Sequence, residues 1–245
     1  MRVKRRTHKL RRLLARVLTA ALVAGPVALV ALWLTFQHKP GWYRPVILDE
    51  AGIQRARSEA VRAADYVSDQ MVEGRPFAAV LHDRSVNAWL AALPHSWPEA
   101  RDVLPPQISD PAVRFDSGEL RVGAHYAAEG WQAIISIGVK LGVSEDSGAV
   151  EIALNGAHGG SLPVPRVVLE GILDHLLQTL HARHDRSIEA AEPLVSALRE
   201  VQSVDELYEG VRIRNRFVWF NGDRPFRIDS IIIDDGELRL QIEPL

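Results

Sequence analysis

Residues with the types and spacing for chemistry occur in four places, and the first is His158-Gly159-Gly160-Ser161. Backbone N–H groups of such a glycine-rich loop can form an oxyanion hole for acyl transfer. That reaction needs a serine nucleophile in a Gly-x-Ser-x-Gly turn, and the sequence has none. We therefore interpret this segment as a loop between a strand and a helix.

A second group consists of histidines near the middle of the C-terminal half. His181 and His184 lie three residues apart beside Asp185, and His175 precedes them. Two histidines at this spacing can share one helix face and bind zinc. No His-Glu-x-x-His pattern is present and the segment is very polar, so a solvated helix end is the preferred interpretation. The chain has no cysteine, which excludes disulfides and thiol chemistry.

Paired carboxylates form the third group. Glu145-Asp146 and Asp234-Asp235 lie where the sequence predicts hairpin turns, and turns favour aspartate for its backbone geometry. We interpret both pairs as turn residues rather than as an acid and a base. No phosphate-binding loop or dinucleotide fingerprint occurs either. The sequence therefore predicts that the protein is not an enzyme and has no cofactor.

Arginines near the C-terminus make up the fourth group. The five members, which could line one polar sheet face, are Arg212, Arg214, Arg216, Arg227 and Arg239. Such a face can be solvated, covered by acidic helices, or occupied by an anionic lipid headgroup. These alternatives are not separated by the sequence.

Charge is distributed very unevenly along the 245 residues. Ten of the 29 basic residues precede Pro45, whereas all 31 acidic residues follow it. The larger part of the chain is therefore strongly acidic and should repel nucleic acid. We expect no nucleic-acid partner.

An apolar run without charges follows the basic start. Val17–Phe36 contains 20 residues, which as a helix would span about 30 Å, the thickness of a bilayer's hydrocarbon core. Gly25-Pro26 is tolerated in membrane helices. The alternative is a cleaved signal peptide, but Gln37–Pro40 offers no good small-x-small cleavage site. The basic tail should stay in the cytoplasm.

We therefore expect an inner-membrane protein that crosses the bilayer once, with most of the chain periplasmic or extracytoplasmic. Its expected parts are a basic cytoplasmic tail at 1–16, a transmembrane helix at 17–36, a linker at 37–47 and an exported domain at 48–245.

The first part of the exported domain should be mainly helical. Apolar residues at helical spacing predict a helix over 48–73, with Gly74 as its stop. A short strand at 77–81 precedes a second helix that Asp83 or Ser85 caps and Pro94 ends. The proline-rich stretch 96–111 is predicted to be a loop.

Strands should follow. Alternation of apolar and polar residues predicts a hairpin around Asp116–Gly118, then a long strand, Trp131–Val143, of about 43 Å. A further strand covers 150–154, and the Gly-rich stretch 155–161 reads as a loop.

The last third mixes helices and strands. Helices are predicted over 166–182 and within 187–208, and strands over 211–220, 226–233 and 238–242. The predicted class is α+β, with a long, curved antiparallel sheet packed on helices.

One internal repeat is visible in these strands. Val113–Val122 resembles Ile231–Leu240, and both contain Gly-Glu-Leu-Arg after a tight turn. The repeat can come from duplication of a unit, or from the small number of residue types that suit tight hairpin turns.

Four stretches together resemble the bacterial YpmS-like proteins, a family without an assigned activity. They are Leu81–Leu90, the hairpin around Asp116–Gly118, Leu162–Gly171 and Asp235–Leu240. A more distant similarity is to exported lipid-binding proteins with elongated tubular folds. The resemblance implies a curved sheet around a long helix, with an apolar groove for acyl chains.

Two functions are therefore expected, neither of them enzymatic. One is a membrane-anchored envelope protein that binds lipid or another amphiphile. The alternative is a structural or scaffold protein that binds another envelope protein. The residues expected to line the groove are Trp131, Ile135, Ile137, Val139, Leu141, Leu169, Leu173 and Leu176.

Overall fold

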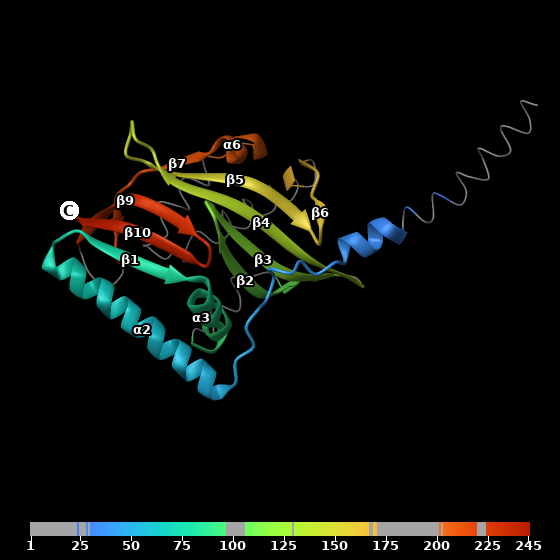
Figure 1. Ribbon diagram of the computed structural model, residues 1–245, viewed down its shortest axis with the longest axis horizontal. Coiled ribbons are helices and arrows are strands. Elements are labelled where there is room, and N and C mark those ends of the chain that lie inside the picture. Colours follow the sequence, from blue (N-terminus) through green and yellow to red (C-terminus); the bar gives the residue numbers. More distant parts are fainter. Residues whose placement is uncertain are drawn as a thin grey trace, which may run out of the picture.

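The chain folds into two antiparallel sheets with helices packed against them, as the predicted α+β class requires (Figure 1). The computed structural model describes residues 24, 28, 30–96, 106–128, 130–166, 169–170, 201, 203–219 and 224–245. The long antiparallel strands are confirmed. They form two sheets rather than the one that the sequence predicted.

The smaller sheet has four strands and joins the two ends of the domain. Its order is β1 (Phe77–His82), β10 (Glu237–Pro244), β9 (Pro225–Asp234) and β8 (Phe217–Val218). The N-terminal strand β1 therefore pairs with the C-terminal strand along its whole length. This pairing ties the first helix of the domain to its last hairpin.

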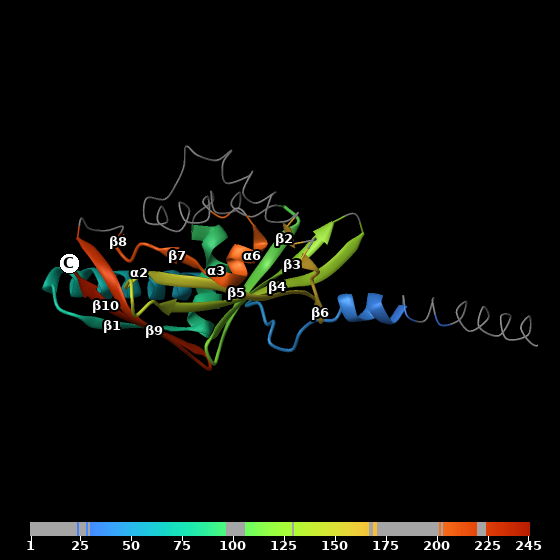
Figure 2. The same ribbon diagram turned by 90° about the horizontal axis from the view of Figure 1, so that it is seen from above.

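The larger sheet has six strands and twists strongly (Figure 2). Five of them follow in chain order: β2 (Ile108–Asp116), β3 (Glu119–Ala128), β4 (Trp131–Val143), β5 (Val150–Gly159) and β6 (Leu162–Pro163). The sixth, β7 (Val211–Ile213), pairs with the other end of β5. Strand β4 has the 13 residues that its alternation predicted.

Helix α2 (Glu50–Glu73) ends where the sequence predicted and begins two residues after the predicted start. The Asp49 carboxylate caps its start by accepting from the Gly52 N–H at 2.7 Å. Gly74 ends it in the left-handed conformation, with φ of 69°. At this end Met71 packs with Phe77 and other side chains of the smaller sheet.

Helix α3 (Asp83–Ser96) lies between α2 and strand β2. The sequence predicted that Pro94 would end it, but the helix continues to Ser96. A proline in the last turn removes one N–H bond without stopping the few residues that follow. The Ser96 hydroxyl donates to the Ala92 carbonyl at 3.1 Å and closes this turn.

The two sheets meet at one end through an apolar core. Phe115 of β2 packs against Ile233 of β9 and Leu238 of β10. Val150 of β5 and Ile213 of β7 form a second cluster with residues of β8 and β9. These contacts leave the other end of the six-stranded sheet beyond the reach of the smaller sheet (Figure 1).

Three predicted boundaries were wrong. Strand β2 starts at Ile108, inside the predicted loop, because a bulge at Asp110-Pro111 accommodates the proline. Strand β5 runs on to Gly159 through a second bulge, where Gly156 adopts φ of 157°. The predicted strand 211–220 is divided into β7 and β8, which belong to different sheets.

The predicted transmembrane helix falls largely on residues that the structure does not describe, and the tail at 1–16 does so entirely. Residues 30–36 are helical, as are the described residues 24 and 28. Within the described part of the chain, no helix is long and apolar enough to cross a membrane. Of the predicted helix at 166–182, residues 166, 169 and 170 are described and helical, and of the region 187–208 predicted to be helical, residues from Val204 on form a helix. Residues 171–200 lie outside the described residues.

Candidate functional site

One face of β4 carries the apolar side chains that the sequence singled out, and we call it the candidate face. At its centre Ile137 lies opposite Val122 of β3 and Ala157 of β5. Ile135 lies opposite Ala124 of β3 in the same way. Because directly opposed residues point to the same side of a sheet, this face stays apolar across three strands.

The end of the candidate face near Val143 belongs to the core. Leu141 packs against the buried cluster of Phe115, Ile233 and Leu238, in which the two sheets meet. It is half-buried there. This residue, which was expected to line a groove, therefore packs against the core between the sheets.

The middle of the candidate face is open. Ile137 keeps 41% of its surface exposed although β4 is an interior strand of the sheet. Ile135 and Val139, on either side of it, are half-buried. A long apolar side chain at the centre of an interior strand is normally covered, so this stretch is a candidate binding surface.

Leu169 is buried beside the candidate face rather than on its open part. It packs with Ala157 of β5 and with Val204, the first residue of α6 (Val204–Glu209). Ala157 is also the cross-strand neighbour of Ile137. Leu173 and Leu176 lie outside the described residues.

Trp131 lies at the far end of β4, away from the smaller sheet. Its ring centroid is 4.7 Å from that of Trp33 and 6.4 Å from that of Phe36. Trp131 nevertheless remains 53% exposed. The predicted groove residues thus occupy three environments: the core, an open middle, and a contact with the end of the apolar run.

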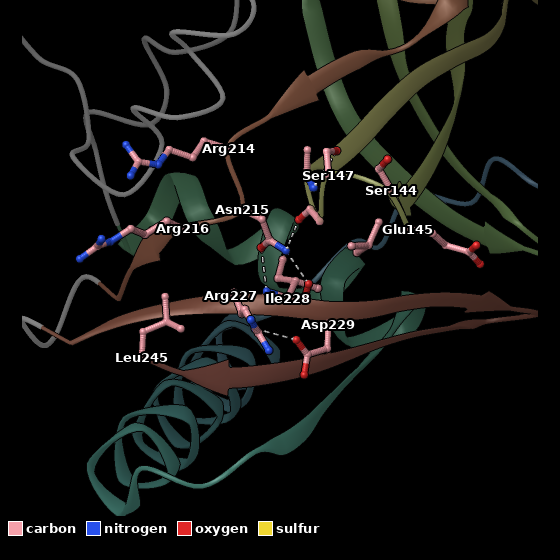
Figure 3. A pocket seen from close by; sticks show the side chains of 13 residues that line it. Ser144, Glu145, Ser147, Arg214, Asn215, Arg216, Arg227, Ile228, Asp229 and Leu245 are labelled. Carbon is pink, nitrogen blue, oxygen red and sulfur yellow. Dashed lines mark hydrogen bonds and ion pairs between the residues drawn. The ribbon is translucent and has the colours of Figure 1, made fainter.

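A cleft of about 640 Å³ lies near the β4–β5 turn, at the opposite end of β4 from Trp131; Figure 3 shows the side chains that line it. It is lined by the β4–β5 turn, by Arg214–Arg216, by Arg227–Asp229 and by Leu245. Arg227 binds Glu243 and, at 3.0 Å, Asp229, and these two carboxylates raise the pKa of its guanidinium. This cleft is therefore partly neutralised by its own acidic residues.

The five arginines of the sequence analysis do not form one basic face. Arg212 pairs with Glu151 at 3.0 Å, and Arg239 pairs with Glu237 at 2.6 Å. Arg214 and Arg216 are exposed at the rim of the cleft. The Arg212–Glu151 and Arg239–Glu237 ion pairs are largely exposed to solvent and therefore contribute little to stability.

Asn215 is a residue whose role sequence reasoning missed. Its side-chain amide donates to the carbonyls of Gly148 and Ile228, at 2.8 and 2.7 Å, and accepts from the Ile228 N–H at 2.8 Å. The side chain thus connects the β4–β5 turn of one sheet with β9 of the other (Figure 3). It lies between β7 and β8, where the predicted single strand is broken.

The carboxylate and histidine motifs singled out in the sequence can now be placed in the fold. Asp235 pairs with Arg114, which also binds Asp83 at 3.1 Å, so this turn carboxylate holds a hairpin to α3. His158 lies within β5 and not in a loop, contrary to the prediction. The group around His181 lies outside the described residues, and the described ones contain no metal-binding cluster.

Comparisons with known proteins give no relative for this chain: no family model, no curated protein and no solved structure matches it.

Proposed function

We propose that the protein is a single-pass membrane protein of the cell envelope whose exported domain binds a lipid or another amphiphile on the candidate face. The run at 17–36 is its anchor, with the basic tail in the cytoplasm and the folded domain on the other side. No catalytic role is part of this proposal.

The observation that carries the proposal is the exposure of Ile137. It is 41% exposed, and its neighbours Val122 and Ala157 are apolar as well. Covering this strip with an acyl chain would remove apolar surface from water at about 25 cal/mol per Å². A ligand of this kind needs few polar partners, which agrees with the lack of charged side chains among these positions.

Photocrosslinking of the full chain tests the proposal. The protein is placed in nanodiscs that contain a phospholipid with a diazirine in its acyl chain, and crosslinked peptides are identified by mass spectrometry. We expect crosslinks in the β4 segment 135–139 in addition to those in the anchor. Crosslinks confined to the anchor and its flanks would contradict lipid binding on this face.

Two tryptophan variants make the experiment specific. Ile137→Trp should fill the open strip and lower β4 crosslinking several-fold. Ile232→Trp is the matched control, because Ile232 lies in the long strand β9 and is 45% exposed. It should leave the crosslinks unchanged, and anchor crosslinks should be equal in all three proteins. If Ile137→Trp has no effect on β4 crosslinks, binding of another envelope protein becomes the better account.

A further inference from the structure

The end of the apolar run is attached to the folded domain by aromatic contacts. Trp33 and Phe36 belong to the helical residues 30–36, and both rings contact Trp131 edge to face. Edge-to-face aromatic pairs are stabilising beyond the apolar area they bury. The start of β4 is therefore packed against the residues where the predicted membrane span ends.

Backbone contacts strengthen this attachment. The Ser161 N–H donates to the Thr35 carbonyl at 3.1 Å, whereas the adjacent Gly160 N–H bonds within the domain, to the Ile134 carbonyl at 2.7 Å. Phe36 lies directly over Gly159, where an added Cβ would be only 2.6 Å from the ring. At Gly160 an added Cβ would overlap with the Phe36 carbonyl group. Two consecutive glycines thus permit the close approach.

The chain is held again a few residues later, on the other face of the six-stranded sheet. Tyr43 is 2% exposed and packs with Ala112 and Ile134. Its hydroxyl donates to the Asp110 carbonyl at 2.6 Å. Trp42 covers Gly123, where an added Cβ would lie 2.7 Å from the indole. The predicted linker at 37–47 is therefore held against the sheet through Trp42 and Tyr43.

We propose that this end of the domain is a membrane-docking surface, with Trp131 inserted in the headgroup layer of the bilayer that the anchor crosses. The inference rests on the proposed anchor. Trp33 lies three residues before Phe36, which places it about 4.5 Å inside the end of the span. Because the two indole rings are 4.7 Å apart, Trp131 lies within that distance of the depth of Trp33, at the boundary between the hydrocarbon core and the headgroup layer.

The chemistry of this end suits the interface between lipid and water. Indole rings favour the headgroup layer, and Trp131 is 53% exposed. Lys39 and Arg44 are exposed nearby in sequence and can reach lipid phosphates. Docking in this way would make β4 rise from the bilayer surface, with its candidate face starting at Trp131.

Single cysteines carrying the fluorophore NBD test the depth, since the chain has no native cysteine. The full chain is placed in nanodiscs of phosphatidylethanolamine and phosphatidylglycerol with nitroxide on the fifth acyl carbon. Three labelled variants are compared: Val30→Cys in the anchor, Gln132→Cys beside Trp131, and Ser147→Cys at the opposite end. We expect strong quenching at 30, at least twofold quenching at 132, and none at 147.

The outcomes separate the two proposals. If the label at 30 is not quenched, the run at 17–36 does not enter the bilayer, and the proposed anchor is wrong. Quenching at 30 combined with none at 132 overturns the docking surface alone, because the anchor is then inserted while the domain stands clear of the membrane.

A glycine pair provides the matched control. Gly160 and Gly148 have nearly equal positive φ, 60° and 62°, so alanine meets similar backbone strain at both. Only at Gly160 does the added Cβ meet Phe36, whereas Gly148 has open space around it. Gly160→Ala should reduce the quenching at 132 to the value at 147, and Gly148→Ala should leave it unchanged. Equal quenching at 132 in both variants would contradict the role of the Phe36 contact in holding this end of the domain at the membrane.

Discussion

Gly118 and Gly236 occupy equivalent positions in two hairpins that bond each other reciprocally. The Gly118 N–H donates to the Ile233 carbonyl at 2.8 Å, and the Gly236 N–H donates to the Phe115 carbonyl at 2.9 Å. In the internal repeat of the sequence, Gly118 aligns with Gly236 and Phe115 with Ile233. The two similar segments therefore meet around a local two-fold relationship at the junction of the sheets.

Alanine at either glycine should weaken this junction. Gly118 and Gly236 have φ of 78° and 82°, a region that costs an alanine about 1–2 kcal/mol. We expect each variant to lower the free energy of unfolding by about 1 kcal/mol in urea denaturation. Gly142→Ala is the control, since it has open space and no positive φ, and should be neutral. Equal stabilities of all three variants would show that alanine is tolerated at these positive φ angles, which would contradict the prediction.

Asn87 should be important for stability because it completes the hydrogen bonds of β2. It is buried, its amide donates to the Val113 carbonyl at 2.8 Å, and it accepts from the Val113 N–H at 2.7 Å. Asn87→Ala leaves both backbone groups unpaired, which should cost about 2–4 kcal/mol. Asn155→Ala, which removes an exposed bond to Glu119, should cost less than about 0.5 kcal/mol. Comparable losses in chemical denaturation would contradict this role of Asn87.

The sequence predicted elements well where the local pattern was complete. Strand β4 was predicted with its observed bounds because every second residue from Trp131 to Val143 is apolar. Strand β5 was predicted too short, since Gly156 and Gly159 resemble a loop and only pairing with β4 makes them a strand. The break at Asn215 was missed for a similar reason. Its bonds go to Gly148 and Ile228, which are distant in sequence.

The candidate site was predicted only as a row of residues. Alternation shows that Ile137 and Leu141 share a face. Because both lie in the same alternating pattern, the sequence does not show that their surroundings differ. What separates them is coverage by Ile233 and Leu238, which come from the last hairpin of the chain. Burial of this kind depends on contacts between distant segments, and no periodicity within β4 carries that information.

Tyr43 should make the protein sensitive to alkaline pH. Burial, with a smaller effect of the Asp110 charge, raises the pKa of its hydroxyl to about 12, against 10.0 for an unperturbed tyrosine. The neutral form is therefore favoured in the folded state. Its contribution to stability is complete below pH 10 and is lost progressively as the pH rises towards 12.

Comparison with a phenylalanine variant isolates this effect. Over the same pH range we expect the native protein to lose about 2 kcal/mol more than Tyr43→Phe in urea titrations. The variant should be less stable at neutral pH by about 1 kcal/mol, because it lacks the bond to the Asp110 carbonyl. Tyr66→Phe is the control, since Tyr66 is 50% exposed and should show the native pH profile. Parallel profiles for Tyr43→Phe and the native chain would refute the assignment.

The independently folding part should begin at about Trp42, as the sequence also predicts, and should therefore include residues that precede the domain boundary at 48. A fragment of residues 42–245 keeps Trp42 over Gly123 and Tyr43 in its cluster with Ala112 and Ile134, whereas 48–245 loses both. Burial of an aromatic side chain contributes about 2–3 kcal/mol. The shorter fragment loses two such side chains, about 4–6 kcal/mol, which in a domain of this size corresponds to a decrease in Tm of roughly 10–20 °C. Thermal unfolding followed by circular dichroism measures the difference, and a third fragment, 42–245 with Trp42→Ala and Tyr43→Ala, should reproduce the lower Tm.

If 42–245 and 48–245 unfold at the same temperature, the packing of Trp42 and Tyr43 does not stabilise the domain, and the segment 37–47 does not hold the domain in place.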